Sequence, residues 1–253
     1  MVMPPSTRQR EILRVLDREG TVALSALARK LGVSLETIRR DLKPLANGGS
    51  LIRMHGAVSL TSMVGEAPFE RRMRENSEAK RAIAASVAAT IRDGDSIMMD
   101  TGTTTSFLAR ELLGHRRLTV VTNSSDIART LATLNDNKVY MAGGELRSDN
   151  GAAFGSTAID FISRFSVTHA IISTGAVNAT GMMDYDLDEA EFARTVITRG
   201  RRTLVVTDQS KFGREGLVRV CGFEAIAELA TDVPPPADIG EAMAAAGTGL
   251  LLA

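Results

Sequence analysis

Two adjacent arginines near the N-terminus, Arg39 and Arg40, carry side chains whose chemistry suits a nucleic acid. A guanidinium donates paired hydrogen bonds to a guanine base or to a phosphate. Apolar residues recur at helical spacing over residues 35–45, so both arginines fall toward the polar side of a predicted helix. Ser34 precedes this helix and can cap its first amides. The residues predicted to contact DNA from this helix are Ser34, Glu36, Thr37, Arg39, Arg40 and Lys43.

A second group of polar residues follows predicted strands in the C-terminal part of the chain. Residues 102–105, Gly-Thr-Thr-Thr, join a strand to a helix, where backbone amides and hydroxyls can hold an anion at the helix N-terminus. Lys211 follows a later strand and can supply a point charge to a phosphate. Because ligands bind beyond the carboxyl ends of parallel strands, we expect one anion pocket there. Its predicted residues are Asp100, Gly102, Thr103, Thr104, Thr105, Asn123, Gly144, Gly175 and Lys211.

Several of these features also have a purely structural explanation. Residues 102–105 could form an ordinary turn with a threonine cap, and Asp100 could either bond a sugar hydroxyl or only hold the loop amides. Lys211 could be a solvated surface lysine. The alternating acids Asp184, Asp186 and Asp188 match no complete ligand set, so we expect a solvated loop and no metal there. No cofactor site is predicted.

The helix that carries the arginines must be positioned by its neighbours. Residues 24–31 predict a second short helix, and Gly32 a tight turn between the two. Two short helices joined by a glycine turn are typical of a helix-turn-helix, whose second helix enters the DNA major groove. A preceding helix begins at Ser6 and ends near Gly20. Pro44 is expected to kink or loosen the second helix after its first two turns.

A small wing is predicted to follow these helices. Residues 51–58 have the pattern of two short strands that turn at His55-Gly56. Arg53 and His55 are therefore added to the predicted DNA contacts. The fold predicted for residues 1–60 is an all-α winged helix-turn-helix.

The rest of the chain predicts an α/β domain. Short apolar runs alternate with helical patterns, which indicates a Rossmann-like, mainly parallel sheet. Residues 61–76 are predicted as a linker and residues 77–253 as this second domain. The predicted strands are 96–100, 119–122, 139–142, 169–173 and 203–207, and the predicted helices are 77–91, 104–113, 125–133, 155–165 and 187–199.

Charge is distributed unevenly along the chain. The 30 basic and 30 acidic residues cancel overall, but residues 1–60 hold ten Lys and Arg against five Asp and Glu. This segment therefore carries about +5 and the remainder about −5, as expected when only the head meets a polyanion. The lone Cys221 cannot form an intramolecular disulfide, and we expect a cytoplasmic protein without membrane contact.

Motifs in both parts of the chain resemble the DeoR-type bacterial transcriptional regulators. In the N-terminal part they are Val33-Ser34, Thr37-Ile38-Arg39-Arg40-Asp41-Leu42, Gly49 and Arg53-Met54-His55-Gly56-Ala57. In the C-terminal part they are Arg71, Lys80-Arg81-x-Ile83-Ala84, Asp100-x-Gly102-Thr103-Thr104, Val121-Thr122-Asn123, Gly143-Gly144 and Asp208-x-Ser210-Lys211-Phe212-Gly213. Two positions depart from the family pattern: one glycine rather than two follows His55, and Arg194 stands where a lysine is expected.

The resemblance implies a repressor of a carbohydrate-use operon that a phosphorylated sugar relieves. It also implies that residues 77–253 are a sugar-phosphate sensor and oligomerisation domain, related to sugar-phosphate isomerases and CoA transferases. The expected partners are a double-stranded DNA operator, a phosphorylated sugar and further copies of the chain, as a dimer or tetramer, because helix-turn-helix proteins usually read two half-sites.

Two other functions stay open from the residues alone. One is a sugar-phosphate isomerase or deaminase with a DNA-binding head, for which Asp100, Asp184 and Asp208 are the candidate bases. The other is a C-terminal domain that serves only in oligomerisation. We expect a regulator and not an enzyme, because no partnered catalytic carboxylate is visible.

Overall fold

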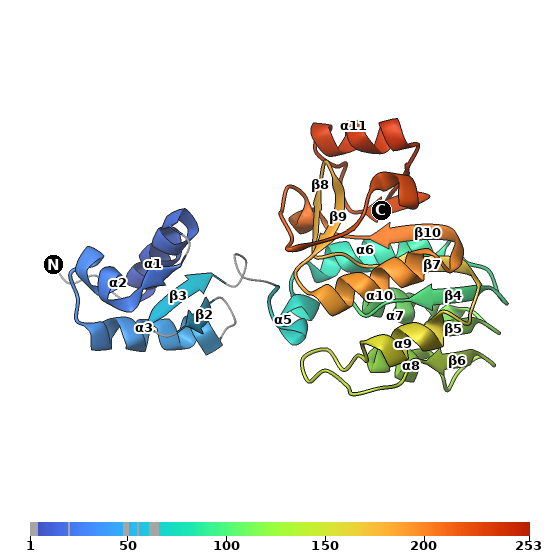
Figure 1. The fold of residues 1–253 in the computed structure, drawn as a ribbon, viewed down its shortest axis with the longest axis horizontal. Helices are drawn as coiled ribbons and strands as arrows, with labels where there is room; N and C mark the ends of the chain where they lie inside the picture. The colour runs from blue at the N-terminus through green and yellow to red at the C-terminus, as the bar shows by residue number, and fades with distance from the viewer. Residues whose placement is uncertain (1–4, 20, 48–50, 55, 61–65) are drawn as a thin grey trace. The chain divides into compact units, whose positions relative to one another are not determined.

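The computed structural model describes residues 5–19, 21–47, 51–54, 56–60 and 66–253. The chain divides into two compact units, residues 1–71 and 72–253 (Figure 1). Part of the stretch predicted as a linker is helical. The helix is α5 (Phe69–Arg74), and its first residue, Phe69, is buried. Residues 61–65 of that stretch lie outside the described part.

The N-terminal unit is a winged helix-turn-helix, as predicted. It contains α1 (Pro5–Glu19), β1 (Val22–Ala23), α2 (Leu24–Lys30), α3 (Leu35–Asn47), β2 (Leu51–Met54) and β3 (Ala57–Leu60). The wing, predicted with two strands, has a third, because β1 joins it in an antiparallel sheet of order β1-β3-β2. A fully buried apolar side chain contributes about 1.5–3 kcal/mol to stability. The fully buried side chains here include Ile12, Leu16, Leu27, Ile38 and Leu42.

Pro44 does not end α3, which stays helical through it to Asn47. Proline removes one helical donor, whose acceptor would be the carbonyl of Arg40. The exposed position of Pro44 leaves that carbonyl open to water, so the remaining turn of helix persists.

The C-terminal unit is built on a seven-stranded sheet in which every neighbouring pair is parallel. Its order is β13-β12-β10-β7-β4-β5-β6. The strands are β4 (Ser96–Met99), β5 (Thr119–Thr122), β6 (Lys138–Met141), β7 (Val167–Ile172), β10 (Gly200–Val206), β12 (Glu228–Thr231) and β13 (Gly249–Leu252). The prediction of a parallel α/β domain is therefore confirmed.

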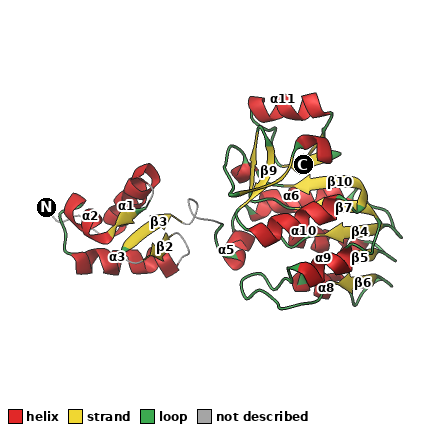
Figure 2. Ribbon diagram, in the orientation of Figure 1, coloured by secondary structure: helices red, strands yellow, loops and turns green. Residues whose placement is uncertain are grey.

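Helices cover both faces of this sheet (Figure 2). Alternation along β4 sends Ile97 and Met99 into one apolar core and Met98 into the other. The first core includes side chains of α6 (Ser77–Ala88), α7 (Thr103–Glu111) and α8 (Ser125–Leu131), and the second those of α9 (Ser156–Ile162), α10 (Leu187–Ile197) and α11 (Ala237–Ala246). The predicted strands and helices of this unit are all present, with ends that differ by at most three residues.

A second sheet was not predicted. It is antiparallel, of order β11-β9-β8, and consists of β8 (Ala176–Asn178), β9 (Gly181–Asp184) and β11 (Val218–Cys221). At Gly181, whose φ is +124°, an added Cβ would lie 2.2 Å from the carbonyl oxygen of Cys221, so only glycine fits. Burial raises the pKa of the Cys221 thiol to about 12, which keeps it protonated at neutral pH.

Candidate functional site

The large sheet changes its direction of winding between β4 and β7. From β4 the chain runs outward through β5 and β6, whereas β7, β10, β12 and β13 follow on the other side. Such a switch point leaves a crevice at the carboxyl ends of the two central strands, where open α/β sheets bind ligands. The residues at these ends are Asp100 after β4 and Ser173 after β7.

Asp100 bridges the switch point. Its two carboxylate oxygens accept hydrogen bonds from the backbone amide of Ser173 at 3.0 and 3.1 Å. Burial raises the pKa of Asp100 well above its ordinary value; the Ser173 amide opposes this shift, and the nearby charges of Glu189 and Asp184 add to it. The carboxylate of Asp100 thus holds an amide of the loop after β7, rather than the amides of its own loop.

The glycine-threonine loop is tightly packed at the start of α7. An added Cβ on Gly102 would lie 2.0 Å from the Ser173 hydroxyl oxygen, so the loop needs glycine there. Thr103, Thr104 and Thr105 form the first turn and are buried. The Thr105 hydroxyl donates to the carbonyls of Asp100 and Gly102 at 3.1 and 3.0 Å. This hydroxyl therefore stabilises the turn.

The other predicted pocket residues follow neighbouring strands but do not all converge. Asn123 follows β5 and is buried, and its Oδ1 has no hydrogen-bond partner among the described residues. Gly175 follows β7 and packs against the Tyr185 ring. Lys211 is half-buried in the turn Gln209–Lys211 after β10. Gly144 follows the edge strand β6 and lies near Ala153, whose carbonyl accepts a hydrogen bond from Asn123 Nδ2 at 3.0 Å.

Arg147 is a residue that the sequence reasoning missed. Its guanidinium lies 3.0, 2.9 and 3.3 Å from carboxylates of Asp186, Asp188 and Glu189, and 4.3 Å from the centre of the Phe154 ring. The expectation of a solvated acidic loop holds for Asp188, which is exposed, but not for Asp184, which is buried in β9; Arg147 pairs with Asp186 and Asp188. Arg147 lies about forty residues before the acidic run, so no local pattern in the sequence links the two.

Carboxylates of the acidic segment also accept hydrogen bonds from nearby backbone amides. Asp184 is buried and accepts from the amides of Tyr185 and Asp186 at 2.7 and 3.2 Å. Asp186 caps α10 by accepting from the amides of Asp188 and Glu189. Within the described residues, no group of His, Cys, Asp and Glu is arranged to hold a metal ion.

The turn that carries Lys211 is tied to the start of α6. Asp208 Oδ1 accepts both from the Ser210 amide at 3.0 Å and from Asn76 Nδ2 at 2.9 Å. Asn76 lies between α5 and α6 in the left-handed conformation, with φ 51°. The buried Lys80 donates to the carbonyls of Arg72 and Glu75 at the end of α5, the latter at 2.9 Å. One carboxylate oxygen thus joins the Lys211 turn to the α5–α6 junction.

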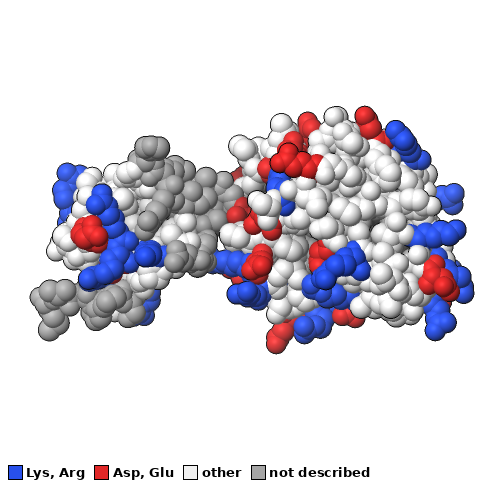
Figure 3. Space-filling view, turned by 90° about the horizontal axis from the view of Figure 1, so that it is seen from below, with Lys and Arg blue, Asp and Glu red and all other residues white. Residues whose placement is uncertain are grey.

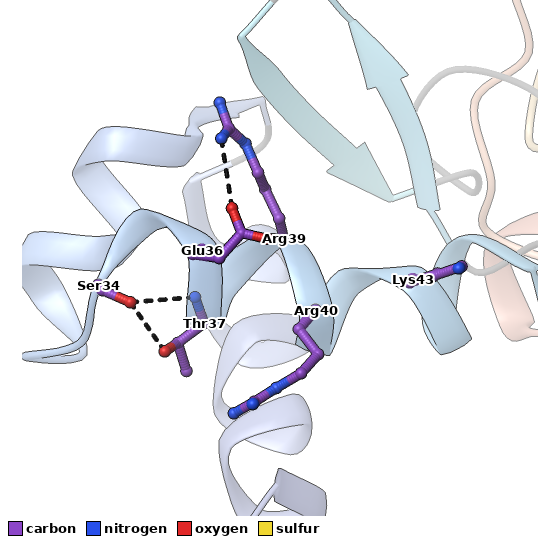
Figure 4. Close-up of a pocket in the computed structure, with 6 residues that line it drawn as sticks. All are labelled: Ser34, Glu36, Thr37, Arg39, Arg40 and Lys43. Atoms are coloured by element: carbon purple, nitrogen blue, oxygen red, sulfur yellow. Dashed lines mark hydrogen bonds and ion pairs between the residues drawn. The ribbon is translucent and has the colours of Figure 1, made fainter.

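On the N-terminal unit, six of the predicted DNA contacts line one shallow groove of about 650 Å³ along α3 (Figure 4). Ser34 caps the helix, since its Oγ accepts from the Thr37 amide at 3.1 Å. Glu36 and Arg39 form an exposed ion pair at 3.5 Å. Arg40 and Lys43 are exposed, and neither has an ionic partner within the described part of the chain.

Basic side chains gather on the face of this unit that carries α3 (Figure 3). Arg39 and Arg40 leave the helix in different directions, because successive residues are turned by about 100° (Figure 4). The wing contacts are less defined. Arg53 lies in β2, where its backbone pairs with Val58, and His55 lies outside the described residues.

None of the described helices combines the length and the apolar character needed to span a membrane.

Comparisons with known proteins cover both units. Residues 8–63 match the DeoR-like helix-turn-helix domain, and residues 75–233 match the DeoR C terminal sensor domain. The chain is 34% identical over 238 residues to the glycerol-3-phosphate regulon repressor of Escherichia coli (strain K12), covering 94% of each chain. It is 36% identical over 234 residues to the protein of the same name from Haemophilus influenzae, covering 92% of this chain and 91% of that one. Among solved structures, ribose 5 phosphate isomerase A from Neisseria gonorrhoeae aligns at 17% identity with a TM-score of 0.40, over 54% of this chain and 53% of that one.

Proposed function

The chain belongs to the DeoR family of transcriptional regulators, and on this premise we propose that it represses a carbohydrate-use operon and leaves its operator when a phosphorylated sugar binds. The observation that carries the proposal is the pairing, in one chain, of a DNA-binding head and a sensor domain. Relatives that share both parts are named repressors of the glycerol-3-phosphate regulon.

The face of α3 supports the DNA-binding half of the proposal. Arg40 and Lys43 are exposed cations, so contact with DNA breaks no ion pair of the described residues. Thr37 contributes a methyl group suited to a thymine and a hydroxyl suited to a phosphate. Arg39 must leave Glu36 to reach a base, at little cost because exposed pairs are worth about 0–1 kcal/mol. Ser34 and the wing residues Arg53 and His55 complete the proposed contacts.

The charges around the switch point support a sugar phosphate as the effector. Lys211 and the first-turn amides of α7 suit one phosphate group. The charges of Asp184 and Glu189 lie close enough to Asp100 to raise its pKa, and these two carboxylates disfavour a second anionic group and favour hydroxyls. A ligand with a single phosphate and several hydroxyls matches this division. Thr103, Thr104 and Asn123 are its further proposed contacts.

A route from this pocket toward the DNA-binding unit is available through Asp208. A phosphate that draws Lys211 would shift the turn whose amide shares Asp208 Oδ1 with Asn76. The α5–α6 junction would then move, and α5 is the first helix that follows the head along the chain. An effector acts in this way only if it binds the two conformations with different affinity.

The names of the relatives support a regulator over an enzyme. The carboxylates considered as candidate bases also have other tasks. Asp100, Asp184 and Asp208 each accept hydrogen bonds from backbone amides. A general base needs a lone pair directed at its substrate.

We further propose a cytoplasmic homodimer or homotetramer. A single head reads one half-site, whereas two heads related by symmetry read a palindromic operator.

The proposed release of DNA by a sugar phosphate is tested on an operator, a duplex selected from random sequences for binding to this chain. We expect glycerol 3-phosphate or another sugar phosphate, such as ribose 5-phosphate, to raise the melting temperature and to weaken operator binding at least tenfold. Inorganic phosphate and glycerol serve as ligand controls. Lys211→Met should abolish both effects, whereas Arg214→Met, which removes an exposed cation nearby, should leave both intact. A chain that binds the operator but responds to no sugar phosphate contradicts the proposed sensor.

A further inference from the structure

One residue of the α3 motif faces away from the DNA side. Asp41 directly follows Arg39 and Arg40, yet its side chain is only 3% exposed. It is bound by Arg8 of α1, which is also 3% exposed. The Arg8 Nε donates to Asp41 Oδ2, and its Nη2 donates to Oδ1 at 3.0 Å. Gln9 of the same helix donates to the Asp41 main-chain carbonyl at 3.2 Å.

This pair lies in a unit whose core is otherwise apolar. Ile12 and Leu16 of α1 and Ile38 and Leu42 of α3 are fully buried around it. Removing two charges from water is costly, and apolar residues of similar volume often stabilise a fold as well or better. Stability alone is therefore a weak reason for an ion pair at this position.

The two-pronged geometry supplies something that apolar packing does not. Hydrophobic contacts are non-directional, so the stripe of Ile38 and Leu42 tolerates small rotations and slides of α3. A bidentate guanidinium–carboxylate pair is satisfied in one relative orientation. Because each residue turns the helix by about 100°, a small rotation of α3 redirects the side chains of Arg39 and Arg40.

We infer that Arg8 and Asp41 are positioning residues for base reading, which fix the rotation and axial position of α3 against α1. Neither residue touches DNA. The inference rests on the proposed role of α3 in contacting bases, and it adds two residues to that function that are buried away from the contact face.

The role can be separated from a simple stabilising one. Contacts to phosphates supply most non-specific affinity, whereas contacts to base edges need an accurately directed helix. A less stable head would lose operator and non-specific binding in equal proportion, because fewer molecules are folded. A misdirected α3 would lose operator binding selectively.

The experiment uses the full chain with Arg8→Met and Asp41→Leu combined. Dissociation constants are measured for the selected operator and for a scrambled duplex of equal length at one salt concentration, alongside the melting temperature. We expect a folded protein whose scrambled-duplex affinity stays within about twofold of wild type. Operator affinity should fall at least tenfold, so the specificity ratio collapses. Lys30→Gln with Glu19→Gln, which removes an exposed pair of the same unit, should leave the ratio unchanged.

A second variant, Arg8→Lys, tests the same role if the double variant does not fold. Arg8→Lys retains a buried charge pair but loses the two-pronged geometry, and it should also lower the ratio. An unchanged ratio in a folded double variant, or in folded Arg8→Lys if the double variant does not fold, overturns the inference. Failure of both variants to fold would overturn it too, by making the pair a requirement for folding. A wild-type chain without operator preference would instead contradict the DNA-reading role of α3.

Discussion

Among single residues, Arg40 and Lys43 offer DNA different chemistry although both are exposed cations of α3. The guanidinium is a planar fork that matches the paired acceptors of guanine, whereas the ammonium is a point charge suited to a phosphate. The two residues are three apart in the helix and therefore lie on neighbouring parts of its surface. We expect Arg40 to specify sequence and Lys43 to contribute affinity.

Replacing Arg40 by Ala should weaken operator binding by about 1–3 kcal/mol and relax the preference at one base pair. Lys43→Ala should instead weaken binding to all duplexes alike and lower the salt dependence by about one counterion. Titrations of an operator library at several salt concentrations measure both effects. Equal losses on operator and scrambled DNA for Arg40→Ala would remove it from the base-reading set.

Asp100 predicts a particular dependence of stability on pH. Burial raises its pKa well above the ordinary 3.8, so the folded chain holds a proton that the unfolded chain has released. The resulting stabilisation is complete below the ordinary pKa and is lost as pH rises through the folded-state pKa. The melting temperature of wild type relative to Asp100→Asn should therefore fall as pH rises from about 4 toward neutrality. Parallel curves for the two proteins would show that Asp100 ionises normally.

Among the elements, α3 depends on the cap at its first turn. Ser34 Oγ accepts from the Thr37 amide and also contacts the Thr37 hydroxyl at 2.9 Å. A capping side chain satisfies one of the amides that have no partner within the helix. Ser34 is thus occupied in the absence of DNA, and its contribution to stability can be measured separately from its contribution to binding.

Ser34→Ala should destabilise the N-terminal unit by about 1 kcal/mol, whereas Ser34→Gly should cost only a few tenths, because glycine is accepted at this position. Denaturant unfolding of the full chain, combined with hydrogen exchange of α3 amides, measures the difference. The same loss for both variants would mean that the hydrogen bond does not support the helix.

For the whole molecule, the proposed coupling between effector binding and DNA release depends on one hydrogen-bonded connection. The shared oxygen of Asp208 joins the Lys211 turn to Asn76, across 132 residues of sequence. Asn76→Gly removes this side chain without strain, since glycine accepts the left-handed conformation. We expect the variant to be stabilised by the effector as wild type is, but to keep the operator bound when effector is present.

Asn135→Gly is the matched control for this prediction. Asn135 is also left-handed, with φ 58°, but its side chain donates to the carbonyl of Leu113 rather than bonding near the Gln209–Lys211 turn. Thermal shift and operator titration on the same samples separate binding from coupling. Normal release of the operator by Asn76→Gly would exclude the Asp208 route.

Local patterns in the sequence were sufficient for the helices of the helix-turn-helix, for the strands and helices of the parallel domain, and for the polar face of α3. The spacing of Ile38 and Leu42, the Ser34 cap and the glycine turn at Gly32 are interactions within a few residues, so they can be recognised without the fold. The parallel strands were predictable for the same reason. The strands β8, β9 and β11 were not, because they lie outside the alternation of strands and helices that marks the parallel sheet, and β11 is held by pairing with β9, which is distant in sequence.

By itself, the sequence determined the kind of protein: a helix-turn-helix head with directed arginines, and an α/β body with small polar residues after its strands. Only the tertiary structure decided which of those residues meet. Strand order brought Asp100 to Ser173 at the switch point and left Gly144 at the far edge of the sheet. The packing of distant segments also forms the ion pairs of Arg8 with Asp41 and of Arg147 with the acidic run. A charged side chain has many possible partners elsewhere in the sequence. The fold determines which partner it meets, because it buries one pair or places one side chain beside a particular loop. Local spacing in the sequence carries no information about that choice.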